Sequence, residues 1–251
     1  MNITIIYQDS DIVAVNKPAG ISVHKGVAEK GETLADWLVE KFPEIKKVGD
    51  EPKLRPGIVH RLDKDTSGVL VAARNQKAFE FLKKQFSAPS LKLLKEGRDL
   101  AHGGQSRSII KKYLALVEGN LKTDKGVIDL PIGRSQKDFR KKLASTEAKG
   151  ELREAVTEYK VLEKFPDYTL VEAYPKTGRT HQIRVHFKAI GHPIVCDSLY
   201  GGKRMTCPFG LKRHFLHSNF LEFDSPSGAR LKLEADLPED LSEVLEGLRK
   251  K

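Results

Sequence analysis

Short runs of alternating apolar and polar residues recur along most of the chain, a pattern typical of half-buried β-strands. Clusters of Asp, Ser, Asn, Pro and Gly separate the runs, and these residue types favour turns. The pattern therefore predicts a strand-rich chain. In chain order, the predicted strands are 3–7, 12–16, 57–62, 69–73, 113–117, 128–132, 155–162, 168–174, 215–223 and 230–235.

Apolar residues at helical spacing predict a smaller number of helices between these strands. Thr33 precedes the first such segment, and a threonine hydroxyl readily accepts hydrogen bonds from the free N–H groups at a helix start. Gly191 follows the third segment, where a glycine suits the end of a helix. The predicted helices are 33–42, 77–86, 180–190 and 237–249.

Two segments follow neither period. Residues 87–108 mix Pro, Gly, Ser and several basic residues, and we interpret them as a possible insertion loop, with a helix and a flexible flank as the alternative. Residues 133–153 are rich in Lys and Arg. We favour a solvated, charged hairpin for this second segment, with dedicated contact to a nucleic acid as the alternative.

The bulk properties narrow the class of protein. The 251 residues can bury a full core and suit one large domain or two closely packed halves. Hydrophobic residues make up 39% and charged residues 31%, which is typical of globular proteins. The net charge of +10 favours a partner such as RNA or DNA, because basic side chains release the counterions condensed on phosphates. A basic protein that binds no nucleic acid is the alternative.

No basic leader followed by an apolar stretch is visible, and no apolar run approaches the roughly 20 residues that span a bilayer. We therefore expect a cytoplasmic protein without a membrane partner. Cys196 and Cys207 are too few for a disulfide scaffold, and we interpret them as two core thiols. Cys207 lies near His214 and His217 in the sequence, but this spacing fits no usual zinc pattern, so no metal is expected.

The densest group of chemically active residues lies at 57–68, where a predicted strand delivers His60, Arg61 and two carboxylates to a polar turn. Asp63 is flanked by basic residues, so it is either a salt-bridged structural group or a nucleophile held ionised by a cation. For Asp65 we prefer a role in shaping the turn. On an extended backbone the two carboxylates would share one face, which keeps a retaining glycoside hydrolase conceivable.

Residues 60–68 (HRLDKDTSG) resemble the signature of the RluA-type pseudouridine synthases. Three further stretches resemble the same family, namely 15–20 (VNKPAG), 111–117 (KKYLALV) and 177–186 (TGRTHQIRVH). They occur in the order of the family and together span most of residues 3–235. Four such stretches in order make the resemblance specific.

The resemblance implies roles for five residues. Asp63 matches the catalytic aspartate, and Arg184 matches a basic residue paired with it. Tyr113 matches a tyrosine that stacks on the target base and is thought to assist proton removal. Ile183 matches an apolar residue packed against the catalytic centre, and Arg61 matches a residue that helps to occupy the space left by the flipped base. Without this match, Tyr113 would be read as a core residue and Arg184 as part of a surface ion pair.

The implied reaction breaks the uracil N1–C1′ bond and forms a C5–C1′ bond, so the product is an isomer of the substrate. The target uridine must leave its stack to be reached. Stacking on an aromatic ring then holds the base, with about 1–3 kcal/mol, and an arginine keeps the aspartate ionised. No cofactor or metal is implied. The implied fold is α+β, with a mixed, largely antiparallel central β-sheet flanked by helices and a basic active-site cleft.

Many family members carry a small N-terminal RNA-binding module, whereas this chain starts almost directly with the catalytic pattern. We therefore expect a single catalytic domain over residues 1–251, acting as a monomer on ribosomal or transfer RNA, with ribosomal RNA preferred. Residues 87–108 are longer than expected for the family. We hypothesise that they contact RNA through four basic residues, Lys92, Lys95, Arg98 and Arg107.

Two other functions remain as alternatives. One is a non-catalytic RNA-binding or ribosome-assembly protein that keeps the fold without the activity. The other is the retaining glycoside hydrolase built on Asp63 and Asp65, for which only one tryptophan, Trp37, is available as a sugar-binding platform.

Overall fold

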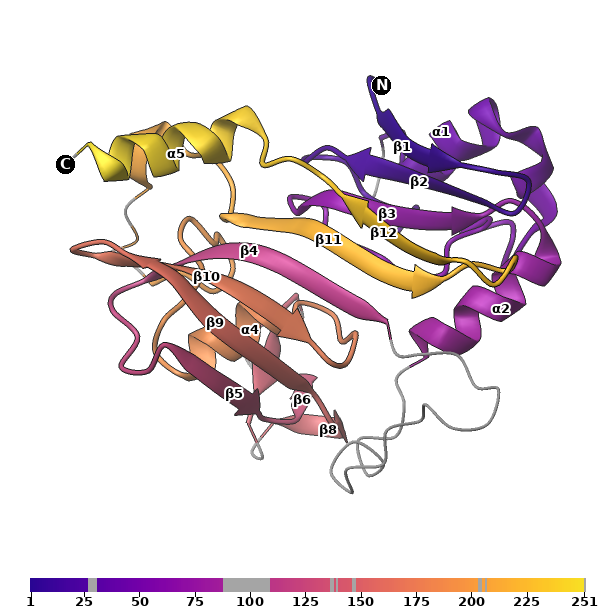
Figure 1. Cartoon of the computed structure of the whole chain (residues 1–251). Helices are drawn as coiled ribbons and strands as arrows, with labels where there is room; N and C mark the ends of the chain where they lie inside the picture. Colours follow the sequence, from indigo (N-terminus) through magenta and orange to yellow (C-terminus); the bar gives the residue numbers. More distant parts are fainter. Residues whose placement is uncertain are drawn as a thin grey trace. The chain divides into compact units, whose positions relative to one another are not determined.

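The computed structural model describes residues 1–26, 31–87, 109–135, 138, 140–145, 148–202, 205 and 207–250 (Figure 1). The chain forms two compact units. The first unit comprises Met1–Ile110 and Ser218–Asp236, and the second comprises Lys111–His217 and Leu237–Lys251. Each unit is thus assembled from two segments that are distant in the sequence. That the chain acts as one catalytic domain stays a prediction.

The first unit is built on a β-sheet whose central strands are buried. Strand β1 pairs antiparallel with β2, β2 with β3, and β11 with β12, while β11 lies next to β3. All residues of β3 are buried, because strands in the middle of a sheet are covered on both faces. The bounds are β1 (Thr4–Gln8), β2 (Ile12–Lys17), β3 (Ser67–Ala73), β11 (Leu216–Asp224) and β12 (Arg230–Glu234).

In the part of the first unit that the structure describes, three helical segments accompany the sheet, and their ends follow from local sequence. The predicted cap at Thr33 is confirmed: its hydroxyl accepts from the Asp36 N–H, and the Asp36 carboxylate accepts from the Thr33 N–H. Phe79 and Leu82 face the sheet and join its core cluster. The segments are α1 (Leu34–Lys41), the 3₁₀ helix η1 (Pro43–Lys47) and α2 (Gln76–Phe86).

The predicted strand at 57–62 is wrong. Of its residues only Ile58 forms an isolated bridge, with Ala72. Gly57 has a φ of +69°, and a Cβ on it would lie 2.5 Å from the carbonyl oxygen of Ala73. The backbone therefore turns where the apolar pattern suggested extension, and the argument for two carboxylates on one strand face loses its basis.

In the second unit, β4 pairs antiparallel with β10, β10 with β9, and β9 with β5. The helix predicted at 180–190 is present in shorter form, and Gly191 follows its last turn with a φ of +85° as expected. The bounds are β4 (Ile110–Glu118), β5 (Lys125–Asp129), β9 (Val156–Lys164), β10 (Tyr168–Pro175), α4 (Gln182–Ala189), the 3₁₀ helix η2 (Pro208–Gly210) and α5 (Glu239–Arg249).

The chain forms a separate small sheet where the sequence predicted a strand at 128–132 and a charged hairpin at 133–153. The predicted strand 128–132 is wrong, because β5 ends at Asp129 and a new strand begins only after Pro131, which cannot donate to a ladder. The predicted charged hairpin is also incomplete, because a central strand pairs with two others in the order β7-β6-β8. These strands are β6 (Ile132–Arg134), β7 (Lys142–Ala144) and β8 (Lys149–Arg153).

Each unit has an apolar core of its own, as expected of compact folding units. In the first unit the core joins the sheet to α2. In the second unit, one cluster places apolar residues of α5, among them Leu241 and Leu245, against Leu116 of β4 and Phe215. A second cluster there includes Val185 of α4. The α+β class with largely antiparallel strands is confirmed.

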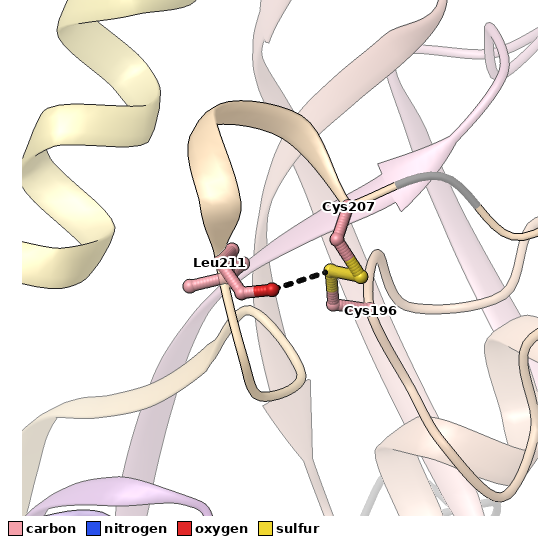
Figure 2. The surroundings of a disulfide bond; sticks show 3 residues. All are labelled: Cys196, Cys207 and Leu211. Atoms are coloured by element: carbon pink, nitrogen blue, oxygen red, sulfur yellow. Dashed lines mark hydrogen bonds between the residues drawn. A yellow bond between two sulfur atoms is a disulfide. The ribbon is translucent and has the colours of Figure 1, made fainter.

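Cys196 and Cys207 are joined in a disulfide, so their interpretation as two core thiols is wrong (Figure 2). Their Cα atoms lie 5.2 Å apart, within the distance that a disulfide spans. Cys196 is buried, with its sulfur 3.4 Å from the carbonyl oxygen of Leu211, whereas Cys207 is exposed. The bond closes a short loop that composition alone does not reveal.

Within the described residues, no helix combines the length and the apolar character needed to cross a membrane. Residues 88–108 lie outside the part of the chain that the structure describes. The proposed RNA contacts of Lys92, Lys95, Arg98 and Arg107 lie there too and stay predictions.

Candidate active site

Asp63 lies in an irregular loop of the first unit that leads into β3. On either side of it, Leu62 and Thr66 are buried, whereas Asp63 is half-buried and Arg61 and Lys64 are exposed. The Thr66 N–H donates to the Asp63 carbonyl oxygen at 3.1 Å and closes a turn. Buried anchors thus fix both ends of the loop and leave the carboxylate at its partly open position.

Lys17, at the end of β2, fixes the backbone directly after the candidate catalytic aspartate. Its side chain is fully buried, and Nζ donates to the carbonyl oxygens of Pro18 (2.8 Å), Ile21 (2.9 Å) and Lys64 (3.0 Å). Burying an ammonium group is costly unless its donors find acceptors. These bonds therefore tie the loop that carries Asp63 to the loop that follows β2.

Two further motif residues have structural tasks. Gly68 has a φ of +117°, and a Cβ there would lie 2.1 Å from the carbonyl oxygen of Ser218, so the backbones approach too closely for any side chain. His60 Nε2 accepts from the Val71 N–H at 3.0 Å, and its ring stacks on Phe86 with a centroid distance of 4.3 Å. His60 is therefore a hydrogen-bonded, structural histidine.

Arg61 contributes positive charge to a part of the first unit that the sequence did not single out. Burial lowers the pKa of His24, and the charges of Arg61 and Arg55 lower it further, against an opposite effect of Glu51. His24 is therefore neutral at pH 7. Arg61 is exposed, so its charge is open to an RNA phosphate.

Tyr113 lies in β4 opposite Ala173 of β10, and only 9% of its surface is exposed. This is the burial of a core residue, as the apolar pattern alone predicts. Lys111 is two positions earlier and shares its strand face. Burial lowers the pKa of the Lys111 ammonium to about 8, so its charge is lost only at mildly alkaline pH.

Arg184, on α4, is buried rather than part of a surface ion pair. Its Nε donates to Oδ2 of Asp197 at 2.7 Å and its Nη2 to Oδ1 at 2.8 Å, and the two side chains are 5% and 0% exposed. The ring of Tyr200 lies against the guanidinium, 5.2 Å from its Cζ. This two-point pairing fixes the plane of the arginine.

The other inward residues of α4 hold the helix in place. Ile183 is buried, as expected for a residue packed in the protein interior. His186 is fully buried, with Nδ1 2.9 Å from the Thr157 hydroxyl and Nε2 3.0 Å from the Leu130 carbonyl oxygen. Burial lowers its pKa. His186 is thus structural, and both polar and apolar side chains hold α4 in place.

The structure places Asp63 and Arg61 in the first unit, and Tyr113, Ile183 and Arg184 in the second. The pairing of Asp63 with Arg184 stays a prediction. Two functional candidates were missed by sequence reasoning.

Those two are Lys17 and Asp197. Lys17 falls within the 15–20 stretch, and its place in a family motif was the one signal available. Asp197 carried no signal, because nothing local identifies the partner of an isolated carboxylate.

Among the residues that the structure describes, no three or more His, Cys, Asp or Glu side chains form a group that could hold a metal ion. Cys207 is part of the disulfide and so offers no thiolate to the nearby histidines.

Comparison with known proteins identifies the family. The family model for RNA pseudouridylate synthase matches residues 11–189, which include Asp63, Tyr113 and Arg184. An uncharacterized RNA pseudouridine synthase of Bacillus subtilis is 41% identical over 251 residues, covering 100% of this chain and 74% of that protein. The ribosomal large subunit pseudouridine synthase D of Borreliella burgdorferi is 38% identical, covering 94% of this chain and 65% of that protein.

A solved structure supports the same conclusion. Human RNA Pseudouridylate Synthase Domain Containing 4 superposes with a TM-score of 0.68 at 26% identity, covering 98% of this chain and 92% of that one. Neither a glycoside hydrolase nor a non-catalytic RNA-binding protein is favoured by these relatives. The chain belongs to the RNA pseudouridylate synthase family, and it is an enzyme that isomerises uridine to pseudouridine in RNA.

Proposed function

We propose that Asp63 is the catalytic aspartate and that Arg184 and Tyr113 act with it. The observation that carries this proposal is the setting of Asp63, a half-buried carboxylate in a signature loop whose backbone Lys17 anchors. An anchored loop holds the reacting group in one geometry, which lowers the barrier of a step that depends on orientation. The isomerisation moves one glycosidic bond from N1 to C5 and consumes no co-reactant.

The remaining candidates supply binding of the flipped uridine. Tyr113 offers a ring for stacking, and a base stacked on an aromatic side chain gains about 1–3 kcal/mol. Arg61 is exposed and positively charged, which suits a residue that enters RNA when the base leaves its stack. Ile183, which directly precedes Arg184 in the sequence, supplies apolar packing. Arg184 keeps Asp63 ionised through its positive charge.

We propose ribosomal RNA as the substrate, with transfer RNA as the alternative. The Borreliella relative carries the large ribosomal subunit in its name. The net charge of +10 supports binding to either RNA, because both present dense phosphates. The choice between them rests on the named relatives alone.

The test is pseudouridine mapping on total RNA from cells that lack the enzyme. The RNA is incubated with the wild type, with Asp63→Asn, and with Asp50→Asn as a matched control on an exposed aspartate of the same unit. We expect new pseudouridines in large-subunit ribosomal RNA with the wild type and the control, and none with Asp63→Asn. An active Asp63→Asn protein would reject the catalytic role, and sites confined to transfer RNA would reject the proposed substrate.

We further propose that the enzyme acts as a monomer in the cytoplasm, where its RNA substrates are found. Light scattering on the purified protein is then expected to give a mass of 28.1 kDa. A mass of twice that value would reject the monomer. Recovery of the protein in a membrane fraction would reject the cytoplasmic assignment.

A further inference from the structure

Arg184 and Asp197 form a pair that is more constrained than an ordinary ion pair. Both side chains are almost completely buried, and two guanidinium nitrogens donate to the two carboxylate oxygens. A planar guanidinium held at two points cannot rotate about its long axis without losing a bond. The direction in which Arg184 presents its charge is therefore decided by Asp197.

Asp197 is itself fixed by the backbone that follows it. Its Oδ1 accepts the N–H of Leu199 at 2.9 Å and the N–H of Tyr200 at 3.0 Å. Burial works to raise the pKa of this carboxyl, but the hydrogen bond and charge of Arg184, the charge of His214 and the Leu199 N–H outweigh it and lower the pKa. Asp197 is therefore ionised at neutral pH.

Tyr200 connects this turn to the start of α4. Its ring lies against the Arg184 guanidinium, and its hydroxyl is 2.9 Å from His181 Nδ1. The same hydroxyl accepts the Lys142 N–H at 2.8 Å. His181 directly precedes α4 and has a φ of +58°, a left-handed conformation that persists only where surrounding contacts enforce it.

The turn from Asp197 to Gly201 has little freedom to move. The Gly201 N–H donates to the Asp197 carbonyl oxygen at 2.7 Å, and a Cβ on Gly201 would lie 2.6 Å from that same oxygen. Cys196, directly before the turn, has a φ of +59° and is bonded to Cys207. The segment that carries the carboxylate is thus fixed at both ends.

We propose that Asp197 is the positioning residue of Arg184, and that the ring of Tyr200 is the second support of the guanidinium. Asp197 does not touch the substrate; it acts by orienting the arginine that serves the reaction. The inference rests on the proposed function in one respect, the participation of Arg184. A purely structural ion pair would stabilise the fold without any link to turnover.

The test is a double-mutant cycle in single-turnover kinetics on the mapped RNA. The proteins are the wild type, Asp197→Asn, Arg184→Gln and the double variant. We expect Asp197→Asn to lower the single-turnover rate constant by about 100-fold, the order expected when a reacting group is displaced by about 1 Å. RNA affinity stays within about twofold, because the lost interaction acts only in the reaction. The double variant is expected to be no slower than Arg184→Gln, whereas additive losses would overturn the inference.

The matched control is Asp240→Asn. Arg213 donates through Nε and an Nη nitrogen to both oxygens of Asp240, at 2.6 and 3.0 Å, in the same unit but with Asp240 half exposed. We expect this variant to retain full activity. An equal loss in the control and in Asp197→Asn would overturn a specific role for Asp197.

Circular dichroism melting shows which proteins fold. If Asp197→Asn does not fold, Asp197→Glu is the variant that tests the inference, because it keeps the charge and shifts the carboxylate by one methylene. A folded Asp197→Glu protein with the wild-type rate constant would overturn the inference. A wild type that makes no pseudouridine would overturn the proposed function. An active wild type together with an equally active Asp197→Asn protein would overturn this inference alone.

Discussion

Two buried cations of this enzyme are held in different ways. In the first unit, the Lys17 ammonium binds three backbone carbonyl oxygens and so joins two loops. In the second unit, the Arg184 guanidinium binds a carboxylate in a two-point pair. An ammonium is a compact point charge that can satisfy scattered carbonyls, whereas a guanidinium has a plane and a direction. A lysine is therefore suited to holding a backbone in place, and an arginine is suited to orienting a charge.

The largest expected effect comes from removing the ammonium group of Lys17. Replacing Lys17 by Met keeps the aliphatic volume but removes this donor from the carbonyl oxygens of Pro18 and Ile21, whereas the carbonyl oxygen of Lys64 keeps the N–H of Gly20. Each buried polar group left unpaired costs about 1–3 kcal/mol, so we expect the free energy of unfolding to fall by about 4 kcal/mol. Urea denaturation measures it. The control is Lys41→Met on the exposed side of α1, and an equal loss there would contradict the role of Lys17.

The second prediction tests the Arg184–Asp197 pair through the pH dependence of the protein's stability. The folded-state pKa of Asp197 lies below its ordinary value, so the stability it contributes is present above the unfolded pKa of about 3.9 and is lost as pH falls through the folded value. We expect the wild type to lose more stability than Asp197→Asn when pH falls from about 4 to 2. Thermal melts across this range are the measurement, and parallel curves would contradict the prediction.

The third prediction concerns the covalent support of the turn beside Asp197. Cys207→Ser opens the loop closed by the disulfide, whose ends are separated by 11 positions. Loops of this size are stabilised by about 3 kcal/mol on cross-linking, and we expect a loss of about 2–3 kcal/mol without reductant. With reductant present, the wild type and the variant are expected to melt together. A difference that survives reduction would show that the serine itself disturbs the fold.

The smallest effect tests Lys111, a half-buried cation of the second unit. Burial lowers the folded-state pKa of Lys111 to about 8, below its unfolded value, so the wild type gains stability as pH rises from about 8 to 10.4. Lys111→Met lacks this dependence and is expected to be more stable at pH 7 by about 1 kcal/mol. Denaturant titrations at pH 7 and pH 10 compare the two proteins. A wild type without pH dependence would contradict the lowered pKa of Lys111.

Local sequence decided the elements whose signals are local. The capped helix at Thr33, the turn at Gly191 and most strands follow from residue types a few positions apart. The strand at 57–62 failed because the apolar run there is folded back by Gly57, whose required conformation depends on the distant carbonyl of Ala73. The strand at 128–132 failed because Pro131 divides it between two sheets.

The sequence by itself determined the family, the reaction and the candidates Asp63, Tyr113 and Arg184, since these reside in contiguous motifs that can be read in order. Only the tertiary structure decided how such residues are held. The bond from Lys17 to Lys64 spans 47 positions, and that from Arg184 to Asp197 spans 13. The disulfide joins two cysteines that composition suggested were separate thiols. A buried charge takes whichever partner the fold brings to it, and no periodicity along the chain encodes that choice.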